Sequence, residues 1–276
     1  MPAPQKDMLA QLAKSNFLSK GVELPMDWLE PGEQYSDAFT PSELMVSPNF
    51  PMNLFREATL NKYHVDAAAT VGEQLADYID GISGAICDGI DNWMKMTMIA
   101  SVIINGPTGM LLPGGVVGPP LMPLILASAP MSTPQEIKYS NAIAGALGTL
   151  WQSWHMGLMG TLMYPAFAVF PGPMAPPTPN IPIPLVTFSS PGESGLSPGT
   201  LKSTMDANLA DPEALHASDL FDAIANAFNT VFQIFKTSTL VQNVLGMGPI
   251  PSFAPPVVPA GPVVAGSVIP TPGVLK

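Results

Sequence analysis

The sequence predicts a mainly α-helical fold made of three diverged repeats, each a helix followed by an extended arm rich in proline and glycine. The first observation is a recurrence, because AIAGALGTLWQSW at 142–154 returns as AIANAFNTVFQIF at 223–235 and more faintly as AICDGIDNWMKM at 85–96. The second is that each helix-like stretch breaks into an apolar region, at Gly106, Pro165 and Gly248. We therefore expect the helices to pack as a core from which long irregular arms extend.

The composition favours one extended array over separate domains. With 276 residues the chain is long enough for one large or two ordinary domains. Only 11% of the residues are charged, while 33 are proline and 24 are glycine. Ordinary soluble enzymes carry more charge, and disordered linkers carry fewer apolar residues. Apolar extended chain of this kind needs a surface to lie against.

The charge and cysteine content exclude several classes of function. A formal net charge of −11 opposes nucleic-acid binding, which draws on clustered Lys and Arg. The single cysteine, Cys87, allows neither an internal disulfide framework nor a cysteine-based zinc site, and we expect it to be a small core side chain. The first residues lack the apolar run of a signal peptide, so we do not expect export by the ordinary secretory route.

Residues 1–60 are expected to form an extended N-terminal arm. A short amphipathic helix fits Lys6–Phe17, and closely spaced prolines then prevent any long element. Five aromatic residues stand at irregular intervals and could pin this arm to a neighbouring surface. They are Trp28, Tyr35, Phe39, Phe50 and Phe55. The alternative is a loosely packed extension.

The first repeat is assigned to residues 61–130. Apolar residues at helical spacing predict a helix over 61–105, and the arm follows over 107–130. Four glycines weaken this helix by about 1 kcal/mol each relative to alanine. They are Gly72, Gly81, Gly84 and Gly89. Close approach of a neighbouring helix is the best explanation for them.

The second repeat is assigned to residues 131–188. Ser132 or Thr133 can cap a helix that begins at Pro134, and Glu136 complements its dipole. We expect this helix to run to about Met163. The arm over 165–188 is so dense in proline that polyproline II or edge-strand geometry is expected.

Residues 189–219 are predicted to be a polar linker loop, and residues 220–276 the third repeat. The third helix is expected over 220–245 with Ser218 and Asp219 as its cap, followed by an arm over 249–275. We predict that the three helices share one interior. Its members would be Ile86, Ile90, Trp93, Ile143, Leu147, Trp151, Ile224, Phe228 and Phe232.

Three long runs without charge raise the question of a membrane. The runs are 96–135, 139–192 and 237–275. The stretch 139–164 is long enough to span a bilayer, but it contains several polar residues and no flanking cluster of Lys or Arg. Extended arms in lipid would leave their backbone groups without hydrogen bonds. Burial against other protein subunits is therefore favoured, and a membrane-embedded or membrane-active protein is the alternative.

No residue pattern indicates a catalytic, cofactor-binding or metal site. His64, His155 and His216 stand apart without ligand spacing. The regularly spaced acids suit a solvated helix face; they are Asp77, Asp80, Asp88 and Asp91. The segment 192–195 has a serine near glycines but lacks the G-x-S-x-G form, so it is interpreted as a turn, and 112–115 lacks the lysine of a phosphate loop. We expect no enzyme activity and no cofactor.

The AIxxAxxTxxQ helices and the closing GPIPSFAPPVVPAGPVVAGSVIPTPG resemble structural proteins of tailed bacteriophages and of related contractile injection apparatus. The resemblance implies a non-enzymatic tail or baseplate component of the virion, assembled in the host cytoplasm, whose arms thread along neighbouring subunits. It carries no functional residue to this chain. Three similar units in one chain could match partners around a threefold or sixfold axis.

Overall fold

A computed structural model describes most of the chain in two compact units. The described residues are 4–21, 57–167, 173–211, 214, 216–251 and 262–276. One unit contains Met1–Lys20 and Ile79–Lys276, and the other contains Gly21–Tyr78. The longest helix, α3 (Glu57–Met96), belongs to the first unit from Ile79 onward. The description below concerns the first unit.

The fold is mixed α/β, so the prediction of a mainly helical protein made of helix-and-arm repeats is wrong. The structure is 54% helix and 19% strand, with the strands in four small antiparallel sheets. Thr108–Leu111, within the segment expected to be an irregular arm, is a strand with alternating burial, and so is Val102–Asn105, which was expected to end the first helix. Proline and glycine between these strands keep each one too short for its period to stand out in the sequence.

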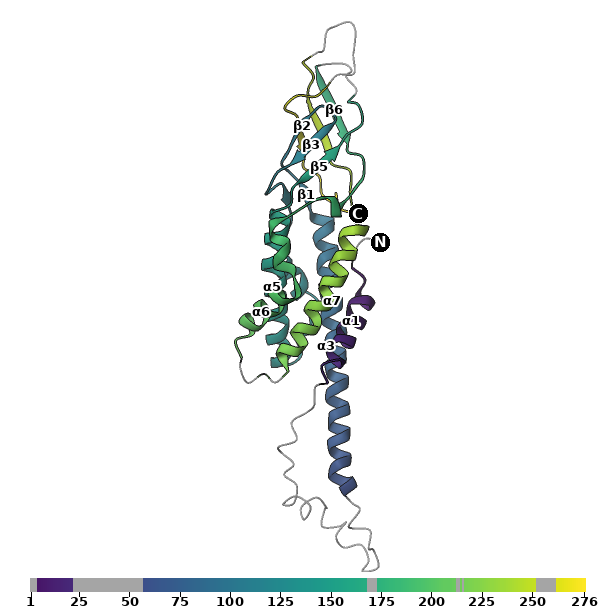
Figure 1. Ribbon diagram of the computed structural model, residues 1–276, viewed down its shortest axis with the longest axis vertical. Helices are drawn as coiled ribbons and strands as arrows, with labels where there is room; N and C mark the ends of the chain where they lie inside the picture. The colour runs from purple at the N-terminus through teal and green to yellow at the C-terminus, as the bar shows by residue number, and fades with distance from the viewer. Residues whose placement is uncertain (1–3, 22–56, 168–172, 212–213, 215, 252–261) are drawn as a thin grey trace, which may run out of the picture. The chain divides into compact units, whose positions relative to one another are not determined.

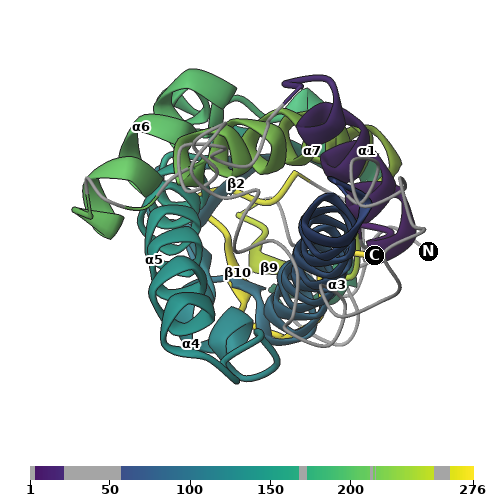
Figure 2. The ribbon, with the colours of Figure 1, turned by 90° about the horizontal axis from the view of Figure 1, so that it is seen from below.

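Three long helices form the inner part of the helical region, and three short helices cover the grooves between them (Figures 1 and 2). The inner helices are α3, α5 (Pro134–Met156) and α7 (Ala217–Ser238). The outer helices are α1 (Lys6–Leu18), α4 (Leu121–Leu126) and α6 (Pro198–Leu209). Around the bundle they follow the order α3, α4, α5, α6, α7, α1 (Figure 2).

The predicted helices exist, but each inner helix ends earlier than expected. α3 ends at Met96, α5 at Met156 and α7 at Ser238, and strands begin within four residues of each end. The start of α5 is as predicted, because Thr133 accepts from the Glu136 backbone and Glu136 caps in return, with Pro134 in the first turn. The start of α7 differs, since its cap position is His216 rather than Ser218 or Asp219.

The predicted shared interior is confirmed. All nine side chains named for it are at most 1% exposed. Near the ends of the inner helices, aromatic rings from all three meet in a layer: Trp93 packs edge-on to Trp151 at 5.1 Å between ring centroids, and Trp151 does the same to Phe232 at 5.9 Å. This aromatic layer joins the helices directly below the strands.

Two of the four helix glycines allow a close neighbour, but only Gly89 lies against another helix, as expected, whereas Gly81 lies against Pro130 outside any helix. A Cβ on Gly89 would lie 2.9 Å from the Ile125 side chain of α4, and one on Gly81 would lie 2.6 Å from Pro130. Gly84 and Gly72 have open space, so close packing does not explain them. α4 approaches α5 in the same way, because a Cβ on Gly148 would lie 2.8 Å from the Met122 Cβ.

Two three-stranded sheets make up most of the strand region, in the orders β2-β3-β5 and β10-β9-β6. The first contains β2 (Val102–Asn105), β3 (Thr108–Leu111) and β5 (Gly160–Met163), and the second contains β6 (Met174–Pro179), β9 (Leu245–Pro249) and β10 (Ser267–Ile269). The two-stranded pairs are β1 (Met98–Ile99) with β4 (Val116–Val117), and β7 (Ile183–Pro184) with β8 (Leu240–Val241).

Backbone bridges connect the two larger sheets on both sides, so the arms bury their apolar side chains within their own chain. Ile104 bridges to Gly266, and Met163 bridges to Ile181. The ring of Tyr164 fills the space between the sheets, where a Cβ on Gly109 or Gly246 would lie within 3 Å of it. Within the described residues, the chain itself therefore covers one face of these strands.

The proline-rich strand β6 lies at a sheet edge, as predicted. It pairs with β9 alone, and its register shifts between Ala175 and Thr178, where two prolines stand. Proline has no N–H to donate to a second neighbour, so the edge is the place it can occupy.

The polar loop expected over 189–219 is instead the 3₁₀ segment η3 (Pro191–Leu196) followed by α6, after the short 3₁₀ segment η2 (Leu185–Thr187). The polar composition of 189–219 gave no sign of a helix, because the buried face of α6 consists of only Leu201 and Met205. The division into five parts stays a prediction. The five aromatic anchors of the N-terminal arm lie outside the described residues.

Candidate interaction surface

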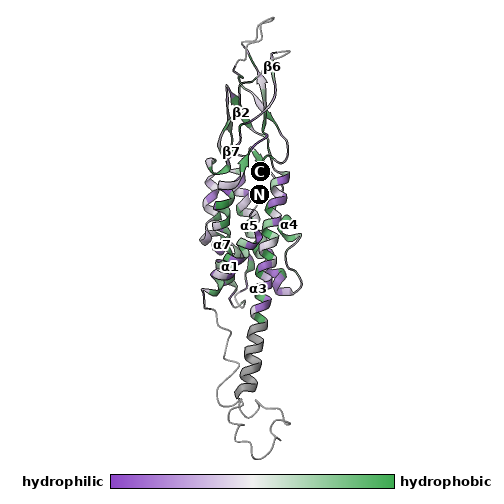
Figure 3. Cartoon of the chain, turned by 90° about the vertical axis from the view of Figure 1, so that its right-hand side faces the viewer, coloured by the Kyte–Doolittle hydropathy of each residue, from purple (hydrophilic) through white to green (hydrophobic). Residues whose placement is uncertain are grey.

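The strands lie in the part of the chain that carries no charge. Every strand falls within the uncharged runs 96–135, 139–192 and 237–275. The charged side chains of the first unit instead stand on the helices and the segments next to them, apart from Lys276 at the chain end. The most hydrophilic residues accordingly lie mainly on the helices (Figure 3). Charged side chains are depleted in the buried centre of protein interfaces, so this distribution makes the strand region the candidate for contact with other molecules.

Four exposed apolar side chains form a row across the sheet β2-β3-β5. They are Ile103, Met110, Met163 and Ile181, with exposed fractions of 46, 60, 40 and 51%. Ile103 pairs with Met110, and Met163 pairs with Ile181. Met110 and Met163 are diagonal neighbours, because Met110 pairs with Thr161 on the same face. We call these four residues the methionine row.

The alternation of the strands explains why the row faces outward. Val102, Ile104 and Leu162 point to the opposite face and are at most 4% exposed. In a pleated strand, successive side chains alternate between faces, so burying one set leaves the other set outside. The outward face of this sheet therefore combines the apolar row with exposed polar side chains such as Thr108 and Thr161, and within the described residues only the opposite face is covered.

A shallow groove of about 440 Å³ runs beside the row. Met110 belongs to both features, and Met159, Ile183 and Thr187 line the rest of the groove together with neighbouring residues of β3 and β5. No ionisable side chain lines it. The groove and the row together offer an uncharged surface of mixed apolar and backbone character.

A second groove, of about 330 Å³, lies between α1 and α3 and has a different character. Its walls include Lys6, Asp7, Lys14 and Asp80, and Lys14 and Asp80 form an exposed ion pair at 2.5 Å. Exposed pairs of this kind contribute little stability. The arrangement holds α1 to α3 and does not concentrate one sign of charge.

The residues with potential chemistry do not converge. His155 is buried in the aromatic layer, and this burial lowers the pKa of its ring. A hydrogen bond with the Trp151 carbonyl at 3.0 Å raises the pKa and partly offsets the effect of burial. Cys87 is 4% exposed, and burial raises the pKa of its thiol to about 12, so it is the predicted core side chain and stays protonated. Asp77, Asp80 and Asp88 are exposed on α3, as expected for a solvated face, whereas Asp91 is half-buried and pairs with Lys95 at 2.5 Å.

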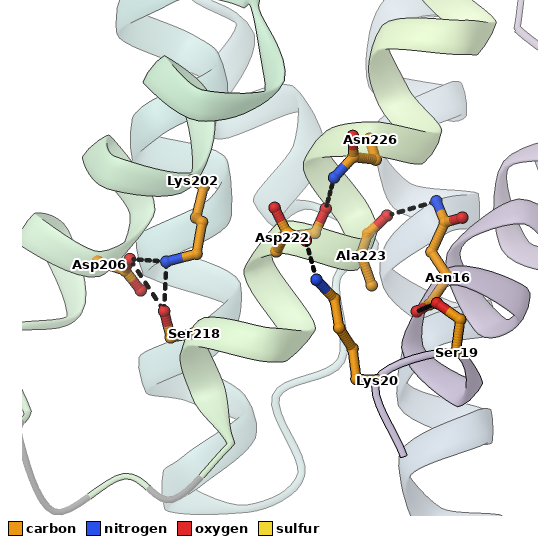
Figure 4. A network of polar contacts seen from close by, with 9 residues as sticks. All are labelled: Asn16, Ser19, Lys20, Lys202, Asp206, Ser218, Asp222, Ala223 and Asn226. Atoms are coloured by element: carbon orange, nitrogen blue, oxygen red, sulfur yellow. Dashed lines mark hydrogen bonds and ion pairs between the residues drawn. The ribbon is translucent and has the colours of Figure 1, made fainter. Parts of the chain in front are cut away.

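Polar side chains instead fasten the outer helices to the inner ones (Figure 4). Lys202 of α6 contacts Asp206 at 2.8 Å and also the Ser218 hydroxyl of α7. On the other side of α7, Lys20 pairs with Asp222, and the Asn16 amide donates to the Ala223 carbonyl at 3.3 Å. In the segment 192–195, Glu193 pairs with the buried Lys236 of α7, so this turn is tied to the same helix.

The described part of the chain contains neither a membrane-crossing helix nor a metal-binding group. None of its helices is both long and apolar enough to span a bilayer. The same residues contain no group of three His, Cys, Asp or Glu side chains placed to hold a metal ion.

Comparison with known proteins gives no relative. No family model matches the chain, and no curated protein or solved structure is significantly similar to it.

Sequence reasoning did not identify the methionine row. Its signal is present as alternation in VIIN and TGML, whose outward positions include Ile103 and Met110. Residues 103 and 105 were expected to end a helix. Their alternation, which is typical of a strand with a period of two residues, was therefore taken as part of a helical pattern with a period of 3.6 residues.

Proposed function

We propose that this protein is a non-enzymatic structural subunit of a large protein assembly, of the kind found in a phage tail or baseplate, and that it docks on neighbouring subunits through the methionine row. The observation that carries the proposal is the row itself: four large apolar side chains, each at least 40% exposed, within a region free of charge. Contiguous exposed apolar surface of this kind marks interaction sites.

The type of side chain supports a protein partner. Methionine is enriched at protein interfaces, and its flexible thioether adapts to irregular surfaces. Methionine is also the most frequent type among the exposed large apolar residues of the described chain. The formal charge of −11 is carried outside the strand region, so the helices can keep the free protein soluble while the strands remain apolar.

The absence of enzyme activity remains part of the proposal. It is supported by the dispersal of the ionisable groups, since an active site needs groups with tuned pKa values that face one another. The virion location rests on the sequence resemblance alone. Threading of the arms along neighbours is not retained, because the arms pack within their own chain.

Charge placed in the row tests the proposal. We expect the double variant Met110→Lys/Met163→Lys to fold normally, because both side chains point to solvent, and to enter its assembly at least about tenfold less efficiently, since burying two unpaired ammonium groups is costly. Ile234→Lys is the control, because Ile234 is 44% exposed on α7, away from the row. Incorporation is measured by quantitative mass spectrometry of purified assemblies, and folding by circular dichroism. Equal incorporation of both variants would refute docking through the row.

The uncharged surface also suits the rival function, a protein that acts on or in a membrane. Fractionation separates the two possibilities, because a protein held by lipid stays with membranes through high salt and alkaline washing. We expect the protein to be released by this treatment or to sediment with a lipid-free assembly. Retention in washed membranes would favour the rival.

A further inference from the structure

The first unit contains three modules with the same order of elements. Each module has a short outer helix, a long inner helix and then strands. The modules are α1, α3 from Ile79 and β1 to β4; then α4, α5 and β5 to β7; then α6, α7 and β8 to β10. Each outer helix covers the groove between its own inner helix and the inner helix of the preceding module, with α1 following α7 to close the circle (Figure 2).

The strands leave the three inner helices in the same way. Ile99, Met159 and Val241 each stand three residues after the last residue of their helix. Each pairs in antiparallel fashion with the end of its own module: Ile99 with Val116, Met159 with Ser189, and Val241 with Leu275. Each of the three modules thus combines helices with strands. The last part of each module pairs with the residues that directly follow its own inner helix.

Backbone hydrogen bonds link the modules in a closed cycle. The end of the first module reaches α5, where Gly114 N–H donates to the Met156 carbonyl at 2.6 Å. The end of the second reaches α7, where Leu185 N–H donates to the Thr239 carbonyl at 2.8 Å. The end of the third reaches α3, where Gly273 N–H donates to the Thr97 carbonyl at 2.9 Å. In each case the acceptor is the last residue of the helix or the one that follows it.

The outer helices repeat a polar contact as well. Asn208 of α6 donates to the Ala142 carbonyl of α5 at 3.1 Å, and Asn16 of α1 donates to the Ala223 carbonyl of α7 at 3.3 Å. Ala142 and Ala223 are the first residues of the two recurring sequence stretches. α4 has no equivalent asparagine in its helix and approaches α3 through Gly89 instead. The strand pairing and the cyclic bonds match in all three modules, and this asparagine contact matches in two of them.

We propose that this chain is a single-chain pseudo-trimer that occupies a threefold axis of its assembly, where a ring of three identical partner subunits contacts its three helix–strand junctions. The proposal rests on the proposed structural function and specifies its partner. A ring with threefold symmetry offers three identical sites, and a chain with three similarly placed surfaces can engage all of them at once.

The exposed residues at the junctions fit such a ring. The last residues of the three inner helices are Met96, Met156 and Ser238, and all three are exposed. Met96 and Met156 have exposed fractions of 42 and 48%, so two of the three junctions present a large apolar side chain to solvent. The methionine row belongs to two modules only, so it breaks the symmetry and selects one rotational setting of the chain in the ring.

Site-specific photo-crosslinking in the native assembly tests the proposal. A photoreactive amino acid is placed singly at Met96, Met156 or Ser238, and the crosslinked subunit is identified by mass spectrometry. We expect all three positions to capture the same partner protein through the same region of its surface. Ile137, which is 41% exposed near the start of α5, is the control. It lies about 28 Å along the helix from Met156, at 1.5 Å per residue, and should not capture that partner.

A second measurement fixes the stoichiometry, and a fourth probe separates the two proposals. Native mass spectrometry of the released complex should give one chain for three partner subunits. Capture of the partner from only one or two junctions, or a 1:1 ratio, would overturn the axial placement. If the axial placement fails but a probe at Met110 still captures a partner, the proposed structural function is retained. If the assembly contains the chain and none of the four probes captures a partner, both the axial placement and the structural function are refuted.

Discussion

At the scale of single residues, Trp151 holds the aromatic layer together. It is fully buried and packs against rings of all three inner helices, including Trp93 and Phe232. We expect Trp151→Ala to lower the free energy of unfolding by about 3–5 kcal/mol, because it leaves a large cavity where the helices meet. Urea denaturation measures the loss. Gln152→Ala, at the exposed neighbouring position, is the control and should change stability by less than about 0.5 kcal/mol.

His155 should make stability depend on pH. Burial lowers its pKa in the folded chain below the value of 6.5 expected for the unfolded chain, so between these two values the unfolded chain binds more protons. The neutral His155 side chain therefore contributes fully to the stability of the fold above about pH 6.5. This contribution is lost as the pH falls toward the pKa of His155 in the folded chain. We expect His155→Gln to unfold with a smaller difference in melting temperature between pH 8 and pH 5 than the parent chain. An unchanged difference in this variant would contradict the assignment.

Residue burial in the helices could be predicted well from the sequence. Ile143, Ile224 and their partners recur at a spacing that only the inward face of a helix satisfies, and Cys87 lies within such a face. The methionine row could not be predicted, because exposure in a sheet depends on which strands pair. Met110 is outside because the other face of its strand, with Gly109 and Leu111, is covered by chain far away in the sequence, such as Tyr164 beside Gly109.

At the scale of elements, the capping box of α5 is a local signal that the structure retains. Thr133 accepts a hydrogen bond from the Glu136 N–H at 3.1 Å, which satisfies a helix-end donor that would otherwise lack a partner. We expect Thr133→Ala to lower the free energy of unfolding by about 1 kcal/mol. In Ser132→Ala the backbone N–H that bonds to Glu136 remains, so this variant should behave like the parent. Chemical denaturation of the two variants side by side makes the comparison.

Among the described helices, α5 begins at Pro134 where its cap was predicted, whereas α1 begins at Lys6 without a side-chain cap and α7 does not begin at the predicted Ser218 or Asp219. The start of α5 thus follows local chemistry. The ends of the inner helices do not, since the residues that follow α5 and α7 remain apolar and could continue a helix by composition. They become strands because distant segments pair with them, as Ser189 does with Met159. Nonlocal pairing of this kind leaves little trace in a single sequence.

At the scale of the whole molecule, the closed cycle of modules predicts tolerance of circular permutation. Joining Lys276 to Met1 through a flexible Gly-Ser linker and opening the chain between Pro119 and Pro120, before α4, moves the termini to the equivalent point of another module. We expect this permutant to fold, with a melting temperature within about 10 °C of the parent. A permutant opened between Gly145 and Ala146, inside α5, should fail to fold. Failure of the first permutant, or equal stability of the two, would contradict the modular description.

The central claim is that the uncharged strand region, and not the charged helices, meets the neighbouring subunits. Hydrogen–deuterium exchange, compared between the isolated chain and the chain in its native assembly, tests it most directly. We predict additional protection in peptides that cover 102–111 and 159–163, with little change in the outward-facing part of α7 around Ile234. Additional protection confined to helix surfaces, or none in the assembly, would contradict the claim.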